Sequence, residues 1–176
     1  MAKPKKQPID LVEIDLARFE EARRLYFKWK DLNSSLRSVT TRGLNFPEGI
    51  SEQLGCYALG YKWNKGSYGD ARSDDGLVIE MKASSNFNKD LTSFSPKEQY
   101  DNLVFLRLNY DENHLFIYDL GIGSDELSII PVNATQTVAD QQLQGRRPRL
   151  SLIKKYIEPN NVAPTVILDI TNGRLI

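Results

Sequence analysis

The chain has 176 residues, of which 40% are hydrophobic and 26% are charged, a composition typical of a globular domain. Its 23 basic and 23 acidic residues cancel, so a nucleic-acid partner would require the basic residues to be gathered locally. One cysteine and one histidine exclude an internal disulfide and a His/Cys zinc site, and no apolar run is long enough to span a bilayer.

The first part of the chain is expected to be helical. Residues 1–9 are basic and polar with no hydrophobic segment after them, so we expect a flexible tail and not a signal peptide. Apolar residues then recur every three or four positions from Asp10 to Lys30, which predicts an amphipathic helix. A polar linker at 33–42 leads to a second helix, with Pro47 at its first position and Asn45 as a candidate cap.

From Tyr61 the hydrophobic period becomes that of extended strands. Residues 68–72 and 77–82 read as a hairpin joined by an Asp-Asp-Gly turn, which tolerates the positive φ of tight hairpins. The later elements are expected to be a short helix from Pro96, a hairpin of residues 103–108 and 115–118, and a last strand over 165–168. This order predicts one domain, residues 1–176, with a mixed α/β (α+β) fold in which helices flank a central mixed β-sheet.

The hairpin places two carboxylates and an ammonium together. Side chains alternate along a strand, so Ile79 and Met81 are expected to face the core while Glu80 and Lys82 share the opposite face. The turn brings Asp70 nearly opposite Glu80, within cross-strand reach. Two adjacent carboxylates repel each other, so Lys82 and a hard divalent cation such as Mg²⁺ are expected beside them.

An acid-X-lysine triplet is common by chance, and a surface ion pair is the plainest explanation of Glu80 and Lys82 taken alone. The upstream Gly69-Asp70, the hairpin and the apolar alternate positions favour a catalytic site. With this context, the segment resembles the motif of the PD-(D/E)XK nuclease superfamily, with Gly69 where the motif often has proline.

The resemblance implies roles for individual residues. Asp70, Glu80 and the main-chain carbonyl of Met81 would hold Mg²⁺, and Lys82 would orient or help deprotonate the attacking water and stabilise charge on the phosphate. Many members also carry a glutamate on a helix before the hairpin, here Glu48 or Glu52. Glu52 is favoured, because a carboxylate in the first helical turn, as at Glu48, is explained by the helix dipole.

Three further stretches are similar to small Type II restriction endonucleases: Arg42–Glu52, Leu91–Pro96 and Gly145–Arg149. With the motif, the resemblance covers about residues 40 to 155, and it is closest to short enzymes that cut interrupted GC-type palindromes. It implies a restriction-endonuclease-like fold and a Mg²⁺-dependent, site-specific enzyme acting on double-stranded DNA. It also implies a homodimer, a cytoplasmic location and a cognate DNA methyltransferase as a functional partner.

Basic residues gather near the C-terminus, where no acid occurs between Asp140 and Glu158. Arginines in such a segment bind phosphates or guanine edges, although a solvated basic loop explains it equally simply. A polar run after the candidate site offers further hydrogen-bonding groups. The candidate DNA-binding residues are Arg42, Ser84, Ser85, Asn86, Lys89, Thr92, Ser93, Arg146, Arg147 and Arg149.

Two other functions remain open at the level of sequence. One is a PD-(D/E)XK nuclease of repair or recombination, which would cleave branched or damaged DNA without a fixed site. The other is a non-catalytic DNA-binding domain, in which Asp70, Glu80 and Lys82 form surface ion pairs and binding does not depend on Mg²⁺.

Overall fold

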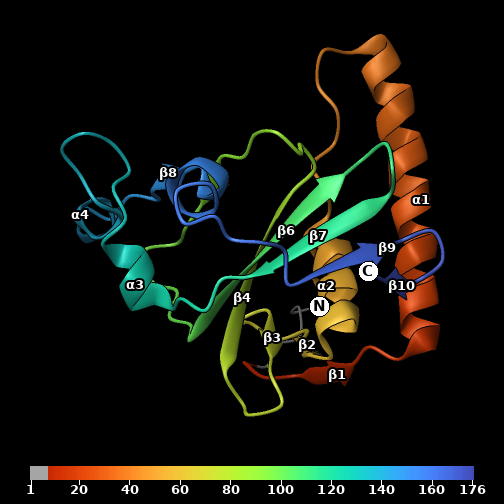
Figure 1. The fold of residues 1–176 in the computed structure, drawn as a ribbon, viewed down its shortest axis with the longest axis horizontal. Helices are drawn as coiled ribbons and strands as arrows, with labels where there is room; N and C mark the ends of the chain where they lie inside the picture. The colour runs from red at the N-terminus through yellow and green to blue at the C-terminus, as the bar shows by residue number, and fades with distance from the viewer. Residues whose placement is uncertain (1–7) are drawn as a thin grey trace, which may run out of the picture.

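The computed structural model describes residues 8–176. It shows a curled sheet covered by two helices on one face, α1 (Leu16–Val39) and α2 (Glu48–Leu59), as Figure 1 shows. The opposite face is covered by α3 (Ser124–Ser128), α4 (Val138–Leu143) and the π-helical turn η1 (Ile153–Ile157). The predicted α+β fold, with helices flanking a mixed central sheet, is therefore confirmed.

The main sheet has eight strands in the order β1-β2-β3-β4-β6-β7-β9-β10. Only β4 and β6 run parallel, and every other neighbouring pair is antiparallel. The strands are β1 (Leu11–Glu13), β2 (Lys62–Asn64), β3 (Ala71–Arg72), β4 (Val78–Ser84), β6 (Asn102–Asn109), β7 (His114–Asp119), β9 (Val166–Asp169) and β10 (Arg174–Leu175). A separate two-stranded ribbon pairs β5 (Thr92–Ser93) with β8 (Arg149–Leu150).

Alternation along the central strands divides the core into two clusters. Val104, Leu106 and Leu108 of β6 pack under α1 and α2, together with Ile79 of β4. Leu103 and Phe105 point to the other face, where they contact the residues of α3, α4 and η1. Burial on both faces makes β4 and β6 the rigid centre of the molecule.

The first helix begins later than the sequence pattern predicts. Residues 11–13, expected to be helical, form β1 and pair with β2. The helix starts at Leu16 because the Oδ1 atom of Asp15 accepts a hydrogen bond from the N–H of Arg18 at 2.9 Å. The predicted start at Asp10 is therefore wrong by six residues.

The same helix also extends through most of the predicted polar linker, to Val39. Asn33 is buried there, and its Oδ1 accepts a hydrogen bond from the N–H of Leu44 at 2.7 Å while its Nδ2 donates to the Tyr110 hydroxyl at 3.3 Å. These long-range bonds overcome the weak helix propensity of asparagine and serine.

Helix α2 forms where it is predicted, but Pro47 occupies the N-cap position and Asn45 is not the cap. Gly55 lets α2 approach the sheet closely, since a Cβ atom there would lie 3.1 Å from Leu106 Cδ2. The chain's single cysteine, Cys56, is fully buried in the same interface.

Two later predictions need correction. No helix begins at Pro96, because the N–H of Asp101 donates to the Val78 carbonyl at 2.9 Å and draws this segment onto the start of β4. The chain between β7 and β9 is more ordered than expected, with α3, α4 and η1 all contributing to the second core cluster. Both predicted hairpins, by contrast, are confirmed.

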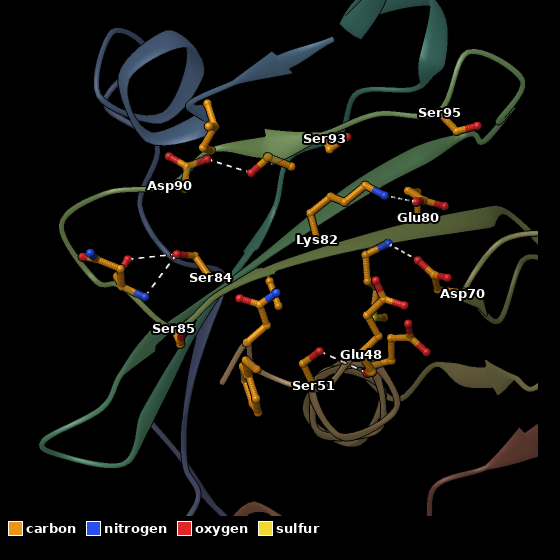
Figure 2. Close-up of a pocket in the computed structure, with 18 of the residues that line it drawn as sticks. Glu48, Ser51, Asp70, Glu80, Lys82, Ser84, Ser85, Asp90, Ser93 and Ser95 are labelled. Atoms are coloured by element: carbon orange, nitrogen blue, oxygen red, sulfur yellow. Dashed lines mark hydrogen bonds and ion pairs between the residues drawn. The ribbon is translucent and has the colours of Figure 1, made fainter. Parts of the chain in front are cut away.

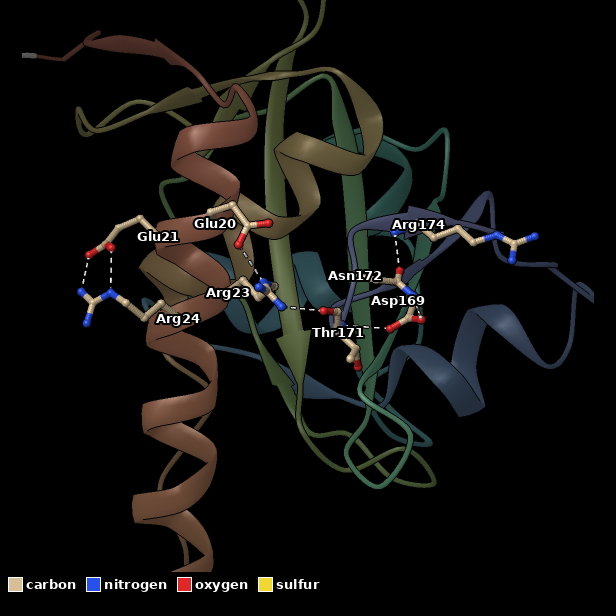
Figure 3. A network of polar contacts seen from close by, with 8 residues as sticks. All are labelled: Glu20, Glu21, Arg23, Arg24, Asp169, Thr171, Asn172 and Arg174. Carbon is tan, nitrogen blue, oxygen red and sulfur yellow. Dashed lines mark hydrogen bonds and ion pairs between the residues drawn. The ribbon is translucent and has the colours of Figure 1, made fainter.

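The C-terminal hairpin is fastened to the N-terminal helix (Figure 3). The Arg23 Nη1 atom of α1 donates to the carbonyl of Thr171 at 2.5 Å, while its Nε donates to Glu20 at 2.9 Å. Gly173, in the β9–β10 turn, has φ +76°, and a Cβ atom there would meet the Phe19 ring at 2.8 Å. The two ends of the chain are thus packed against each other.

The predicted tail falls largely outside the described residues. Its last part is held in place, because the carbonyl of Pro8 accepts hydrogen bonds from the N–H groups of Ser67 at 3.2 Å and Tyr68 at 3.1 Å. None of the helices within residues 8–176 is sufficiently long and apolar to cross a membrane.

Candidate active site

A cavity of about 910 Å³ opens above the C-terminal half of β4, between α2 and the segment that contains β5. Figure 2 shows the Asp70, Glu80 and Lys82 side chains together in it, with Ser93 and Ser95 on the facing segment. The predicted site residues that line this cavity are Glu52, Asp70, Glu80, Met81, Lys82, Ser84, Ser85, Asn86, Lys89, Thr92, Ser93 and Arg147. Arg42, Arg146 and Arg149 do not line it.

Asp70 lies where β3 and β4 separate. Its N–H donates to the Ile79 carbonyl and its carbonyl accepts the N–H of Asn64, both at 2.8 Å, which places it opposite Glu80 as predicted. Its Oδ2 atom accepts the N–H of Met81 at 2.7 Å. Burial, together with the charge of Glu52, raises the pKa of Asp70 to about 7.

Gly69 sets this backbone. Its φ is +69°, and a Cβ atom would lie 2.6 Å from Val78 Cγ1. Proline fixes φ near about −65°, so the proline common in the motif does not fit this conformation. The departure at Gly69 is therefore required by the local backbone.

Glu80 and Lys82 form an ion pair in which Lys82 Nζ lies 2.5 Å from Glu80 Oε1. The Glu80 side chain is 6% exposed and that of Lys82 is 20% exposed. Burial and the charge of Asp70 raise the pKa of Glu80 to about 7. Burial lowers the pKa of Lys82, but the charge and hydrogen bond of Glu80 outweigh it and leave that pKa above its usual value. The alternative of a solvated surface pair does not describe this geometry.

Both glutamates of α2 reach the cavity, but only one is fixed. Glu48 is exposed in the first turn, whereas Glu52 is half-buried and its Oε2 accepts the indole N–H of Trp63 at 2.8 Å. Burial raises the pKa of Glu52, and the nearby charges of Glu48 and Glu80 raise it further. The structure thus favours Glu52 as the member of this carboxylate cluster.

The donor set fits a hard divalent cation. Within residues 8–176 no three acidic, histidine or cysteine side chains are arranged to hold a metal ion by themselves. Mg²⁺, however, is usually held by one or two carboxylates and completes its coordination with water and phosphate oxygens. Asp70 and Glu80 supply such carboxylates, and a cation beside them would offset the burial and the neighbouring negative charges that raise the pKa of each.

Asp90 lines the cavity, but its carboxylate is hydrogen-bonded to residues outside the acidic cluster. Its carboxylate accepts hydrogen bonds from Ser151 Oγ at 2.5 Å, Leu152 N at 2.7 Å, Ile153 N at 3.2 Å and Thr92 Oγ1 at 2.8 Å. It therefore joins the start of the β5 strand to the end of β8.

The ribbon brings together the polar run and the basic segment, which are far apart in sequence. Ser93 pairs with Arg149, and the N–H of Phe94 donates to the Pro148 carbonyl at 3.1 Å. Arg147, Arg146 and Arg149 are exposed on this side of the molecule, and Arg147 reaches the cavity.

Three of the predicted DNA-binding side chains instead build the loop that precedes the ribbon. Ser84 Oγ donates to the carbonyls of Asn86 and Lys89 at 3.0 and 3.1 Å. Asn86 Oδ1 accepts the N–H groups of Asn88 and Lys89, and Thr92 is buried with its hydroxyl bonded to Asp90. Ser85, Lys89 and Ser93 remain available at the cavity.

Sequence reasoning missed three residues of this site: Trp63, Asp90 and Glu98. Glu98 lies 3.8 Å from the Lys82 ammonium, as a second carboxylate partner. Asp90 and Glu98 line the cavity, whereas Trp63 joins the site through its hydrogen bond to Glu52. No local pattern marks these three positions, because contacts with other segments place each of them at the site.

Comparison with known proteins gives two matches. The family model described as Bsp6I restriction endonuclease matches residues 14–159. The chain is also 50% identical, over 168 residues, to the Type II restriction enzyme Bsp6I of Bacillus sp. (strain RFL6), covering 95% of this chain and 97% of that protein.

Proposed function

Because the chain belongs to the Bsp6I restriction endonuclease family and is therefore a Type II site-specific deoxyribonuclease, we propose that the cavity above β4 is its active site. The observation that carries this proposal is the meeting of the Asp70, Glu80 and Lys82 side chains in one cavity. The proposed unit is a single nuclease domain of residues 1–176.

Restriction endonucleases generally need a divalent metal, and we propose Mg²⁺ held by Asp70, Glu80 and the main-chain carbonyl of Met81. Such an ion, when bound, polarises the scissile phosphate and lowers the pKa of a water molecule. Glu52 completes the site by contacting a water of the ion or by orienting Lys82.

Lys82 acts as a cation, since Glu80 keeps its pKa raised. The ammonium would orient the attacking water and stabilise the charge that develops on the phosphate. The water oxygen bonds to phosphorus and releases a proton to the solvent, the bond to one sugar oxygen breaks with its electron pair, and that oxygen takes up a proton from the solvent.

DNA contacts are proposed for the ribbon side of the cavity. Arg147 and Lys89 are exposed cations suited to phosphates or guanine edges, and Ser85 and Ser93 offer hydroxyl groups beside them. Arg42, Arg146 and Arg149 lie outside the cavity and are proposed to contact DNA beyond the scissile bond.

The same proposal includes a homodimer, because two-fold symmetry matches a palindromic site and supplies one active site for each strand. A cytoplasmic location and a methyltransferase that protects the host DNA complete it.

A digest of a long, defined duplex tests the active site. With Mg²⁺, discrete fragments are expected; they should disappear with EDTA and fall by at least about 100-fold in Glu80→Ala and Lys82→Ala. Lys62→Ala is a matched control, because Lys62 faces Glu13 at 3.9 Å in an exposed strand pair. Unchanged cleavage by Glu80→Ala would refute the site, and a smear would indicate a nuclease without sequence specificity.

A further inference from the structure

Trp63 lies in the middle of β2, paired with Val12 of β1 and Ala71 of β3. Its indole N–H donates to Glu52 Oε2 at 2.8 Å, which joins the sheet to α2. The next residue, Asn64, donates its N–H to the Asp70 carbonyl at 2.8 Å. Strand β2 therefore holds two acids of the cavity, one by a side chain and one by the backbone.

Glu52 needs such a restraint. It is a long, flexible side chain in a half-buried position, and the negative charges of Glu48 and Glu80 act against it. Without a donor, repulsion favours rotamers that carry the carboxylate away from the other acids. Among residues 8–176, the Trp63 indole N–H is the group that donates a hydrogen bond to the Glu52 carboxylate.

The type of donor matters as much as its place. An arginine or lysine at position 63 would neutralise Glu52 and compete with a cation for the cavity. An indole N–H is neutral and donates one hydrogen bond, so it fixes one carboxylate oxygen and leaves the negative charge for the cation.

We propose that Trp63 is a positioning residue, which holds Glu52 in the orientation that strengthens Mg²⁺ binding at the cavity. This inference rests on the proposed function of Asp70, Glu80 and Glu52. It assigns to Trp63 a role in the reaction that acts only through Glu52.

The chain offers a matched control in its other tryptophan. The indole N–H of Trp29 is buried with no acceptor in the part of the chain that the structure describes, and its ring stacks on Phe46 at 4.9 Å. Trp29→Phe therefore removes an indole N–H that positions no carboxylate.

The test measures Mg²⁺ binding to the whole protein by calorimetry without DNA, and the Mg²⁺ concentration for half-maximal cleavage. Trp63→Phe should weaken both by about 10-fold or more, as loss of an outer hydrogen bond at a metal site does. Trp63→His should restore much of the affinity at a pH where its imidazole is neutral, because a flipped imidazole places Nε2–H where the indole N–H was. Trp29→Phe should bind Mg²⁺ as the wild type does.

Glu52→Gln separates this inference from the function on which it rests. If Glu52→Gln weakens Mg²⁺ binding but Trp63→Phe does not, the role of Trp63 is refuted and that of Glu52 stands. If neither weakens it while Glu80→Gln does, the proposed role of Glu52 is wrong and the inference falls with it. If Glu80→Gln also binds normally, the proposed metal site itself is wrong.

A second replacement covers the case in which Trp63→Phe does not fold. Biosynthetic substitution of tryptophan by 3-benzothienylalanine keeps the ring shape and replaces each N–H by sulfur. Both tryptophans change, but only that of residue 63 has an acceptor among the described residues. Weaker Mg²⁺ binding supports the proposal, and wild-type binding overturns it.

Discussion

Asp70 and Glu80 are carboxylates in an environment that disfavours their charge. Burial raises the pKa of each to about 7, against ordinary values of 3.8 and 4.5, and the charge of Glu52 adds to the effect at Asp70 as that of Asp70 does at Glu80. The folded protein therefore holds protons at these groups more tightly than the unfolded chain does. A divalent cation would replace those protons and remove the same repulsion.

This sets a pH dependence for the metal-free protein. Between about pH 4 and pH 7 the native state binds more protons, so its stability in EDTA should fall as pH rises and stay low above pH 7. Mg²⁺ should raise Tm at pH 8 and have little effect at pH 5, which calorimetric scans will measure.

Asp70→Asn provides the control for this pH dependence. The variant should lose part of the decline with pH, because one of the two repelling carboxylates is gone. A Tm in EDTA that is higher at pH 8 than at pH 5 would contradict the expected sign.

Gly69 gives a second prediction at this scale. Gly69→Ala places a side chain at φ +69° and 2.6 Å from Val78 Cγ1, so it should cost about 1–3 kcal/mol in the free energy of unfolding. Gly49→Ala, in α2 with open space around it, should be neutral or stabilising by about 0.5–1 kcal/mol. Urea denaturation of both variants checks this, and equal stability would refute the strain at Gly69.

The part of the site that the sequence predicts is formed by residues close together in the chain. Asp70, Glu80 and Lys82 lie in one hairpin, where alternation and the turn determine which side chains meet. Glu98 reaches the same cavity from another segment, and Trp63 contacts it only through Glu52, so no spacing in the chain links either residue to the hairpin.

Among the elements, the β5–β8 ribbon depends on one acid. Asp90 accepts two main-chain N–H groups and a hydroxyl from residues 151–153 just after β8, in addition to the Thr92 hydroxyl. The ribbon itself has only two paired positions. Its placement over the cavity therefore relies on Asp90 more than on strand pairing.

Asp90→Ala should consequently weaken DNA binding and leave Mg²⁺ binding unchanged. Unsatisfied N–H groups cost about 1–3 kcal/mol, which corresponds to about 5- to 150-fold in affinity if the cost falls on the bound ribbon. Gel-shift titrations in Ca²⁺ measure this, with Asp140→Asn, the capping acid of α4, as control. Equal loss in both variants would argue against a specific role for Asp90.

Elements set by near neighbours were predictable, and those set by distant contacts were not. The β6–β7 hairpin follows from two apolar runs around a polar turn. The extension of α1 to Val39 follows from the hydrogen bonds of Asn33 to Leu44 and Tyr110. The polar sequence of this segment gives no indication of those distant partners. The absence of a helix at Pro96 likewise depends on the pairing of Asp101 with Val78.

In the whole molecule, zero net charge is compatible with DNA binding because the charges are sorted. The acids Asp70, Glu80 and Glu52 lie at the floor of the cavity, and Arg147 and Lys89 lie at its ribbon side. The proposed catalytic groups come from residues 52–82, whereas the ribbon comes from segments on both sides of β6 and β7. The residues proposed to contact DNA at the ribbon and those proposed to cut it thus belong to different elements.

A homodimer is the prediction at this scale. Light scattering should give a mass of twice the 20.1 kDa chain, with or without a duplex carrying the site. A protein that remains monomeric on DNA would contradict the two-fold arrangement. Such a monomer would be expected to cleave only one strand.

The burial of Cys56 makes the motion of the active-site helix measurable. Burial, with the charges of Glu52 and Asp70, holds the pKa of this thiol well above its usual value, and no other cysteine is present in the chain. A thiol reagent can therefore react only when α2 moves away from the sheet, which also carries Glu52 out of the cavity. The labelling rate with and without Mg²⁺ or DNA would report how often α2 opens and removes Glu52 from the proposed active site.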